Sequence, residues 1–258
     1  MDLTIAVILG IVEGISEFLP ISSTGHLILA SSLLGLDADS DFLKSFNIAI
    51  QVGAILSVVV LYWRDLLVKR AVILRVIVAF LPTGVIGLTL YKLIKSYLLG
   101  STSVVLWSLA LGGLFLIVFE YLHKDKEQAP ARPEDITYRQ AFIIGLFQSL
   151  AMVPGVSRSA STIVGGLVLG LHRKTIVEFS FLLAAPTMAA ATAYDLLKSG
   201  PLFSADQFMF LAVGFVMSFV VALLSIQFLL RFIQTHTFIP FGVYRIVLVA
   251  AWAAFLYL

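Results

Sequence analysis

Six stretches of the chain are apolar over about twenty consecutive residues, which is the length that an α-helix needs to cross the hydrocarbon core of a bilayer. A run of this length without alternating polar positions is typical of a transmembrane helix rather than of the amphipathic helices of soluble domains. The pattern therefore predicts about six full transmembrane helices. They are expected over residues 45–62, 71–91, 101–121, 176–197, 207–231 and 238–258.

Two further apolar regions are shorter, and each is interrupted by proline and by hydroxyl residues. Residues 4–19 run into "EFLPISSTG", and residues 139–153 run into "VPGVSRSAST" before a second short helix at 160–171. At membrane depth, such breaks in a helix persist only inside protein or against a water-filled cavity. We therefore expect two re-entrant hairpins of broken helices, over residues 1–36 and 139–171.

The two broken regions resemble each other in sequence. "AVILGIVEGISEFLPISST" (6–24) lies over "AFIIGLFQSLAMVPGVSRS" (141–159), and the stretches that follow also run parallel. The matched pairs are Ala6 with Ala141, Gly10 with Gly145, and Ser22 with Ser157. We interpret this as an internal repeat, with a first half at 1–121, a loop at 122–138 and a second half at 139–258.

The distribution of basic residues predicts how the halves are oriented. If each hairpin leaves the membrane on the side that it entered, the loops of one side hold eleven Lys and Arg residues and those of the other hold four. The eleven are Arg64, Lys69, Arg70, Arg75, Lys124, Lys126, Arg132, Arg139, Arg173, Lys174 and Arg231, and the four are Lys44, Lys92, Lys95 and Lys198. Because an excess of positive charge marks the cytoplasmic side, both termini are expected outside. The hairpins then enter from opposite sides, so the repeat is inverted and its two tips should meet near the bilayer midplane.

The composition agrees with a membrane protein. Of the 258 residues, 60% are hydrophobic and 12% are charged, and the mean hydropathy is +1.04; a soluble domain carries about 25% charged residues. The net charge of +2 and the lack of a basic cluster give no reason to expect a nucleic-acid partner. The chain has no cysteine, which excludes disulfides and thiolate metal sites. The fold class expected is an all-α integral membrane protein.

Glu13 and Glu17 are four residues apart in the first broken region, so on one helix they share a face. Each ionised carboxylate at bilayer depth costs about 2.5–3.5 kcal/mol, and two like charges on one face cost more. Either one of them is protonated or they hold a metal ion, and oxygen ligands favour Mg²⁺ or Ca²⁺. The structural alternative is a hydrogen-bonded pair between helices.

Ser22, Ser23, Thr24 and His26 follow Pro20 directly. Hydroxyl residues after a proline favour a helix N-terminus, so a helix is expected over residues 23–35. Ser22 and His26 are one helical turn apart, within reach of a hydrogen bond between a nucleophile and its base. The alternative is a histidine that only satisfies a contact in the core.

Arg158 lies at the second break, among Ser157, Ser159 and Thr162. A guanidinium does not deprotonate in proteins, so a buried one needs an anion as partner. That anion is either Glu13 or Glu17, or a substrate phosphate bound at the start of the following helix. The two tips together suggest a pyrophosphate site, and the alternative is an Arg–Glu bridge that locks the hairpins. Both can hold when no substrate is bound.

Three other polar residues lie within apolar stretches. Gln51 could hydrogen-bond to the site or only to a neighbouring helix. Gln148 occupies the position of Glu13 in the second repeat and could be its partner there. Arg245 is seven residues into the last span, where it could reach the interface or pair with a carboxylate.

These motifs resemble those of a known family. The segments concerned are "EGISEFLPISSTGHL" (13–27), "IQVGAIL" (50–56), "PGVSRSAST" (154–162) and "EFSFLLAAPT" (178–187). Over nearly its whole length the chain is similar to the bacterial undecaprenyl pyrophosphate phosphatases, also called the bacitracin-resistance family. Ala160 departs from the family pattern, which usually has glycine at that position.

The resemblance implies hydrolysis of the C55 isoprenyl diphosphate carrier to its monophosphate and inorganic phosphate, with a divalent cation, at the outer side of the bacterial cytoplasmic membrane. This reaction recycles the carrier for peptidoglycan synthesis, and bacitracin competes for the same lipid. A homodimer is a further expectation. The residues that match the family's functional positions are Glu13, Glu17, Ser22, His26, Ser157, Arg158 and Thr162. Further expected substrate contacts are Ser23, Thr24, Ser159 and Gln51.

Two mechanisms fit these residues. In one, Ser22 attacks the phosphoryl group and His26 acts as its base; in the other, His26 is the nucleophile and a glutamate is the base. The alternative function is a transporter or flippase of a lipid phosphate or an organic anion, since inverted repeats with broken helices also build transporters. The density of Glu13, Glu17, Ser22 and His26 in one short stretch argues against an anion carrier.

Overall fold

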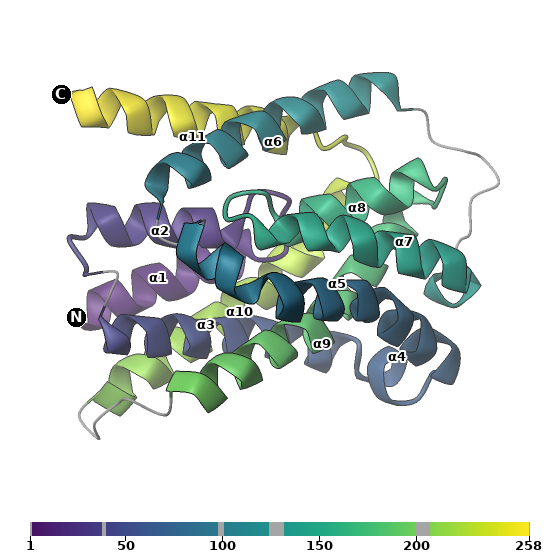
Figure 1. Cartoon of the computed structure of the whole chain (residues 1–258), viewed down its shortest axis with the longest axis horizontal. Helices are drawn as coiled ribbons and strands as arrows, with labels where there is room; N and C mark the ends of the chain where they lie inside the picture. Colours follow the sequence, from purple (N-terminus) through teal and green to yellow (C-terminus); the bar gives the residue numbers. More distant parts are fainter. Residues whose placement is uncertain (1, 38–39, 98–100, 124–131, 200–206, 258) are drawn as a thin grey trace.

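The computed structural model describes residues 2–37, 40–97, 101–123, 132–199 and 207–257, and within these ranges the chain forms helices joined by short turns and loops (Figure 1). The long helices are α3 (Asp41–Leu61), α5 (Arg70–Tyr97), α6 (Thr102–Leu122), α9 (Arg173–Ser199), α10 (Phe208–Phe232) and α11 (Ile239–Tyr257). The shorter elements are α1 (Leu3–Ser16), α2 (Ser23–Leu33), α4 (Trp63–Leu67), α7 (Tyr138–Ser149), α8 (Arg158–Val168) and the 3₁₀ turns η1 (Pro133–Asp135) and η2 (Leu150–Met152).

The long helices lie where the apolar stretches predicted them. Five of them, α3, α5, α6, α9 and α10, are long and apolar enough to cross a membrane, and the described apolar part of α11 is a little shorter. The all-α, multi-pass membrane fold is therefore confirmed. The internal repeat and the division into halves stay predictions, and residues 124–131 of the predicted loop 122–138 lie outside the described residues.

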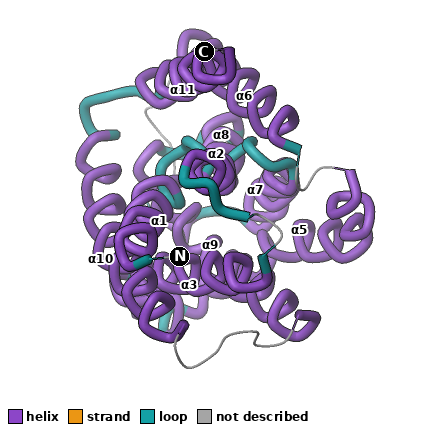
Figure 2. The backbone as a smooth tube through the Cα atoms, turned by 90° about the vertical axis from the view of Figure 1, so that its left-hand side faces the viewer, coloured by secondary structure: helices purple, strands orange, loops and turns teal. Residues whose placement is uncertain are grey.

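The two hairpins occupy opposite halves of the molecule. Figure 1 shows α1 and α2 in the left half and α7 and α8 in the right half, with both ends of the chain on the left. Seen from the left-hand side, α2 and α8 lie near the centre of the helix assembly, with α6 and α11 above them and α3, α9 and α10 below (Figure 2). The breaks between the short helices therefore lie in the interior, where helices on several sides enclose them.

The two breaks are built in the same way. Among the described residues, Ser22 and Ser157 are the non-glycine residues with positive φ, at 74° and 82°. Each serine is the N-cap of the helix that follows, and its hydroxyl accepts a hydrogen bond from the backbone of Gly25 or Ala160. Capping satisfies a backbone N–H that a helix start would otherwise leave without a partner. The hydroxyl clusters therefore do start helices, at residues 23 and 158, and α8 begins two residues earlier than predicted.

Small residues let α10 pack closely against α1 and α3. A Cβ atom added at Gly14 of α1 would lie 2.8 Å from the Ser218 carbonyl oxygen of α10. On the other side of α10, the Ser218 hydroxyl donates a 2.7 Å hydrogen bond to the Ile50 carbonyl of α3. Close backbone approach and hydroxyl hydrogen bonds are how helices associate in a membrane, where the hydrophobic effect does not hold them together. This packing fixes α1, the helix that carries Glu13 and is followed directly by Glu17.

Replacing Gly14 by alanine should loosen the contact between α1 and α10. The new Cβ would lie 2.7 Å from Val221 Cβ and would also meet the Ser218 carbonyl oxygen. We therefore expect overpacking to lower the free energy of unfolding by about 1–3 kcal/mol. Unfolding of the purified protein in detergent measures this loss. Gly84→Ala on α5 is the matched control, because its Cβ would meet Phe80 Cζ at an ordinary 3.4 Å. Equal unfolding midpoints for the two variants would contradict the close packing.

Candidate active site

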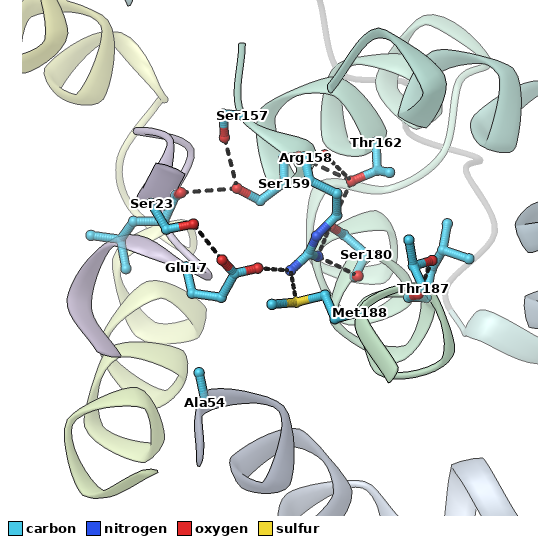
Figure 3. A network of polar contacts seen from close by, with 12 residues as sticks. Glu17, Ser23, Ala54, Ser157, Arg158, Ser159, Thr162, Ser180, Thr187 and Met188 are labelled. Carbon is cyan, nitrogen blue, oxygen red and sulfur yellow. Dashed lines mark hydrogen bonds and ion pairs between the residues drawn. The ribbon is translucent and has the colours of Figure 1, made fainter. Parts of the chain in front are cut away.

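The ends of the two hairpins meet through a buried ion pair. Arg158 Nη2, at the start of α8, lies 2.8 Å from Glu17 Oε1, just after α1, and the two side chains are 12% and 6% exposed. Figure 3 shows the two side chains pointing toward one another. A second contact joins the same segments, because the Ser159 hydroxyl donates a 2.9 Å hydrogen bond to the Leu19 carbonyl. Residues 141 positions apart are thus brought into one site.

Arg158 is also held by α9. Its Nη1 donates a 2.9 Å hydrogen bond to the Ser180 carbonyl, and the Ser180 hydroxyl lies 2.6 Å from the Thr162 hydroxyl. The guanidinium carbon lies 5.8 Å from the centre of the Phe18 ring, within the range of a cation–π interaction. The third donor group, the Nε–H, is buried and has no hydrogen-bond partner. One donor of Arg158 therefore remains available for an oxygen ligand.

The two glutamates have different surroundings. Both oxygens of Glu17 are engaged, Oε1 by Arg158 and Oε2 by the Ser23 hydroxyl. Glu13 is fully buried, one helical turn earlier, and neither of its oxygens has a hydrogen-bond partner. A buried carboxylate without a partner is strongly disfavoured, so it either takes up a proton or receives a cation. Glu13 is therefore the residue that could hold a cation, with Glu17 four residues later as the next carboxylate. In the described part of the chain, no third His, Asp or Glu completes a metal cluster there.

His26 makes different contacts from those that the Ser22–His26 spacing suggested. Its Nδ1 lies 2.7 Å from the backbone carbonyl oxygen of Ser22, and its Nε2 lies 2.9 Å from the hydroxyl of Tyr244 on α11. The Ser22 hydroxyl instead accepts from the Gly25 backbone N–H, at 3.4 Å. A hydrogen bond between the Ser22 hydroxyl and the imidazole is absent from the described contacts. The Ser22 hydroxyl therefore caps helix α2.

The other predicted contact residues divide into two groups. Ser23, Ser157, Ser159 and Thr162 all lie at the meeting point of the tips, and the Ser157 and Ser159 hydroxyls are 3.1 Å apart (Figure 3). Thr24 is exposed and Gln51 is half-buried on α3, and none of the described hydrogen bonds connects either of them to the ion pair. The sequence analysis missed Ser180 and Tyr244. Ser180 lies within the quoted segment "EFSFLLAAPT", but nothing in the pattern singles it out.

Gln148 is not a partner of the glutamates. Its amide nitrogen donates to the hydroxyls of Thr83 on α5 and Thr187 on α9, at 2.9 and 3.2 Å. Gln148 occupies the same position in α7 that Glu13 occupies in α1, but its contacts are with α5 and α9. The amide links α7 to two long helices and helps to hold the second hairpin.

The sequence suggested that Arg245 either reaches the interface or pairs with a carboxylate, and both suggestions are wrong. The side chain is fully buried. Its guanidinium donates to four backbone carbonyls, those of Ser108, Leu109, Gly155 and Val156. The last two belong to the second tip, directly before the cap residue Ser157. Because Gly155 has φ +92°, the turn depends on a conformation that glycine adopts readily. Arg245 thus fixes the backbone that presents Arg158.

A polar cavity of about 450 Å³ lies beside α4, away from the two tips. It is lined by three basic residues, Lys69, Arg132 and Lys174, and by three acidic residues, Asp65, Glu134 and Glu178. Its charges pair with one another, as in Lys69 with Asp65 at 2.8 Å. The hydrogen bond to Asp65 raises the pKa of Lys69. The tips instead hold a buried carboxylate and a buried Nε–H without partners, so they remain the better candidate for a ligand.

Comparison with known proteins finds relatives over nearly the whole chain. The family described as "Bacitracin resistance protein BacA" matches residues 6–251. The undecaprenyl-diphosphatase of Aquifex aeolicus is 53% identical over 250 residues, which cover 97% of each chain. The undecaprenyl-diphosphatase of Wolinella succinogenes is 52% identical over 248 residues, which cover 96% of each chain. That of a Sulfurihydrogenibium species is 54% identical over 243 residues, which cover 94% of this chain and 95% of the relative.

The ion pair between the tips should show strong coupling in a double-mutant cycle. Removing one partner leaves the other charge buried, so Arg158→Met and Glu17→Gln should each lower the free energy of unfolding by about 3–5 kcal/mol. The double variant should lose clearly less than the sum of the two, as measured by unfolding in mixed micelles. The control cycle is Lys174→Met with Glu178→Gln, a more exposed pair for which a coupling of about 0–1 kcal/mol is expected. Additive losses at Glu17 and Arg158 would show that the tips do not meet in this way.

Proposed function

The chain belongs to the bacitracin resistance protein BacA family, and on this basis we propose that it is an enzyme that hydrolyses undecaprenyl diphosphate to undecaprenyl monophosphate and inorganic phosphate. The observation that carries the proposal is the meeting of Glu13, Glu17 and Arg158 in one buried place. A guanidinium recognises phosphate oxygens, and carboxylates hold the divalent cations that accompany diphosphates. Phosphoryl transfer needs mainly positioning and neutralisation of charge, which these few groups can supply.

Two helix N-termini favour the binding of an anion in the same place. Helix α2 begins at Ser23 and α8 begins at Arg158, and the contact between Ser159 and Leu19 joins the first turn of α8 to the segment before α2. The N-terminus of a helix carries a partial positive charge and free backbone N–H groups. Arg158 contributes its Nε–H, which is the one donor group of this side chain without a partner. We propose that the terminal phosphate binds Nε and competes with Glu17 for Nη2.

A divalent cation fits the remaining carboxylate. Glu13 has two buried oxygens without partners, and Glu17 is the nearest further acidic ligand on the same chain segment. When bound, Mg²⁺ or Ca²⁺ would neutralise charge on the phosphoryl oxygens. Glu13 and Glu17 would hold the ion, and water and substrate oxygens would complete its shell, as is usual for Mg²⁺.

The lipid nature of the substrate fits the multi-pass fold. We propose that the prenyl tail lies in the membrane while the diphosphate reaches the tips, and that the protein is in the bacterial cytoplasmic membrane with its site toward the outer side and both termini outside. The excess of basic residues in one set of loops supports this orientation. Bacitracin would compete with the enzyme for the same lipid. A homodimer stays a prediction, which the molecular mass of the purified protein in detergent would test.

Phosphate release by the purified protein tests the proposed function. With a C55 or C15 prenyl diphosphate as substrate, we expect release of inorganic phosphate that stops when a chelator is added and resumes with Mg²⁺ or Ca²⁺. Arg158→Lys should lower turnover by about 10²–10³-fold, because an ammonium cannot bridge Glu17 and Ser180 and still reach phosphate. Glu178→Gln, outside the tips, is the control and should keep its turnover. Uptake of substrate into vesicles without phosphate release would favour the transporter instead.

The nucleophile is a separate question, and Ser22 and His26 both remain candidates. Attack by either breaks the bond between the terminal phosphorus and the bridging oxygen, which leaves with the prenyl monophosphate; water then releases phosphate. The imidazole of His26 contacts the Ser22 backbone carbonyl and Tyr244, and so it is not placed as a base for the Ser22 hydroxyl. This favours His26 itself as the nucleophile. We therefore expect a trapped ³²P adduct to be acid-labile, as phosphohistidine is. An acid-stable adduct that disappears in Ser22→Ala would assign the attack to serine.

A further inference from the structure

The imidazole of His26 is held between two oxygens from different parts of the chain. Nδ1 lies 2.7 Å from the Ser22 carbonyl oxygen, and Nε2 lies 2.9 Å from the Tyr244 hydroxyl. The rings of His26 and Tyr244 are nearly parallel, at 6°, with centres 5.5 Å apart. Both nitrogens of the ring are therefore engaged.

These two contacts determine the tautomer of the neutral ring. A backbone carbonyl only accepts hydrogen bonds, so Nδ1 must carry the hydrogen that bonds to Ser22. Nε2 then holds the lone pair, and the Tyr244 hydroxyl must be the donor to it. Nε2 is thus the nitrogen that can take a proton or attack phosphorus, and Tyr244 covers it.

Tyr244 is itself held firmly relative to the second tip. The next residue, Arg245, is fully buried and donates to the carbonyls of Gly155 and Val156. Helix α11 also packs closely on α6, since a Cβ at Gly113 would lie 2.7 Å from the Gly242 carbonyl oxygen. Consecutive residues of α11 therefore contact the two tips, Tyr244 through His26 and Arg245 through residues 155–156.

We infer that Tyr244 is a positioning residue for His26. Its hydroxyl keeps the imidazole in the Nδ1–H tautomer and orients Nε2 until substrate arrives. If Nε2 takes up a proton during the reaction, the hydroxyl of Tyr244 rotates from donor to acceptor, and no other group has to move. The effect on turnover rests on the proposed phosphatase function, whereas the tautomer is a property of the resting protein.

The tautomer can be observed directly. In protein labelled with ¹⁵N-histidine in lipid nanodiscs, two-bond ¹H–¹⁵N spectra distinguish Nδ1–H from Nε2–H, and His26→Gln assigns the signal. We expect the Nδ1–H form in the wild type and a mixture with Nε2–H in Tyr244→Phe, which keeps the ring and loses only the hydroxyl. Tyr121→Phe is the control, because Tyr121 is an exposed tyrosine at the end of α6. It should keep the wild-type spectrum.

Turnover should follow the tautomer. With a prenyl diphosphate as substrate, we expect Tyr244→Phe to lower kcat by about tenfold, which corresponds to about 1.4 kcal/mol, while KM stays within about twofold. A wild-type His26 in the Nε2–H form, or a Tyr244→Phe variant with unchanged tautomer and kcat, would overturn the inference. An absence of phosphate release from the wild type would count against the proposed function instead, and the spectra would still decide the role of Tyr244.

Discussion

The ion pair between Glu17 and Arg158 is the interaction on which the rest of the structure depends. A charged side chain at membrane depth is tolerated when it meets an opposite charge or a polar cavity. Here the two charges come from hairpins on opposite halves of the molecule, and each lies beside the break in its own hairpin. Their pairing in the interior therefore forces the two broken ends together and creates one polar place inside an apolar fold. The same two residues are the ones that a diphosphate would use.

The surrounding structure serves this meeting point. The caps at Ser22 and Ser157 start two helices there, and close packing of α10 fixes α1, which carries Glu13 and ends directly before Glu17. On the other side, α11 contributes Tyr244 to one tip and Arg245 to the other. The unpaired carboxylate of Glu13 and the free Nε–H of Arg158 are then the groups left for ligands. Apart from the carboxylate of Glu13, the polar side chains of this site are each held by a neighbour.

Sequence alone was sufficient for the parts that follow from hydropathy and charge. Long apolar runs predict spanning helices, proline and hydroxyl clusters predict breaks, and buried carboxylates and an arginine need partners. It was not sufficient for contacts to the backbone. Arg245 binds four carbonyls and His26 binds the Ser22 carbonyl, and any residue supplies a carbonyl, so these partners leave no signal in the sequence. Tyr244 and Ser180 were missed for a related reason, since only the packing of α9 and α11 brings them to the tips.

The most direct measurement is cross-linking of the two tips in native membranes. The chain has no cysteine, so the pair Leu19→Cys and Ser159→Cys would be the only thiols present. Because the Ser159 hydroxyl lies 2.9 Å from the Leu19 carbonyl, a short thiol cross-linker should join the two positions within one chain, as mass spectrometry of the digested protein would show. The pair Leu19→Cys with Arg64→Cys on α4 should not be joined. If each of the two cysteines reacts with the cross-linker but no link between residues 19 and 159 forms, the tips do not meet.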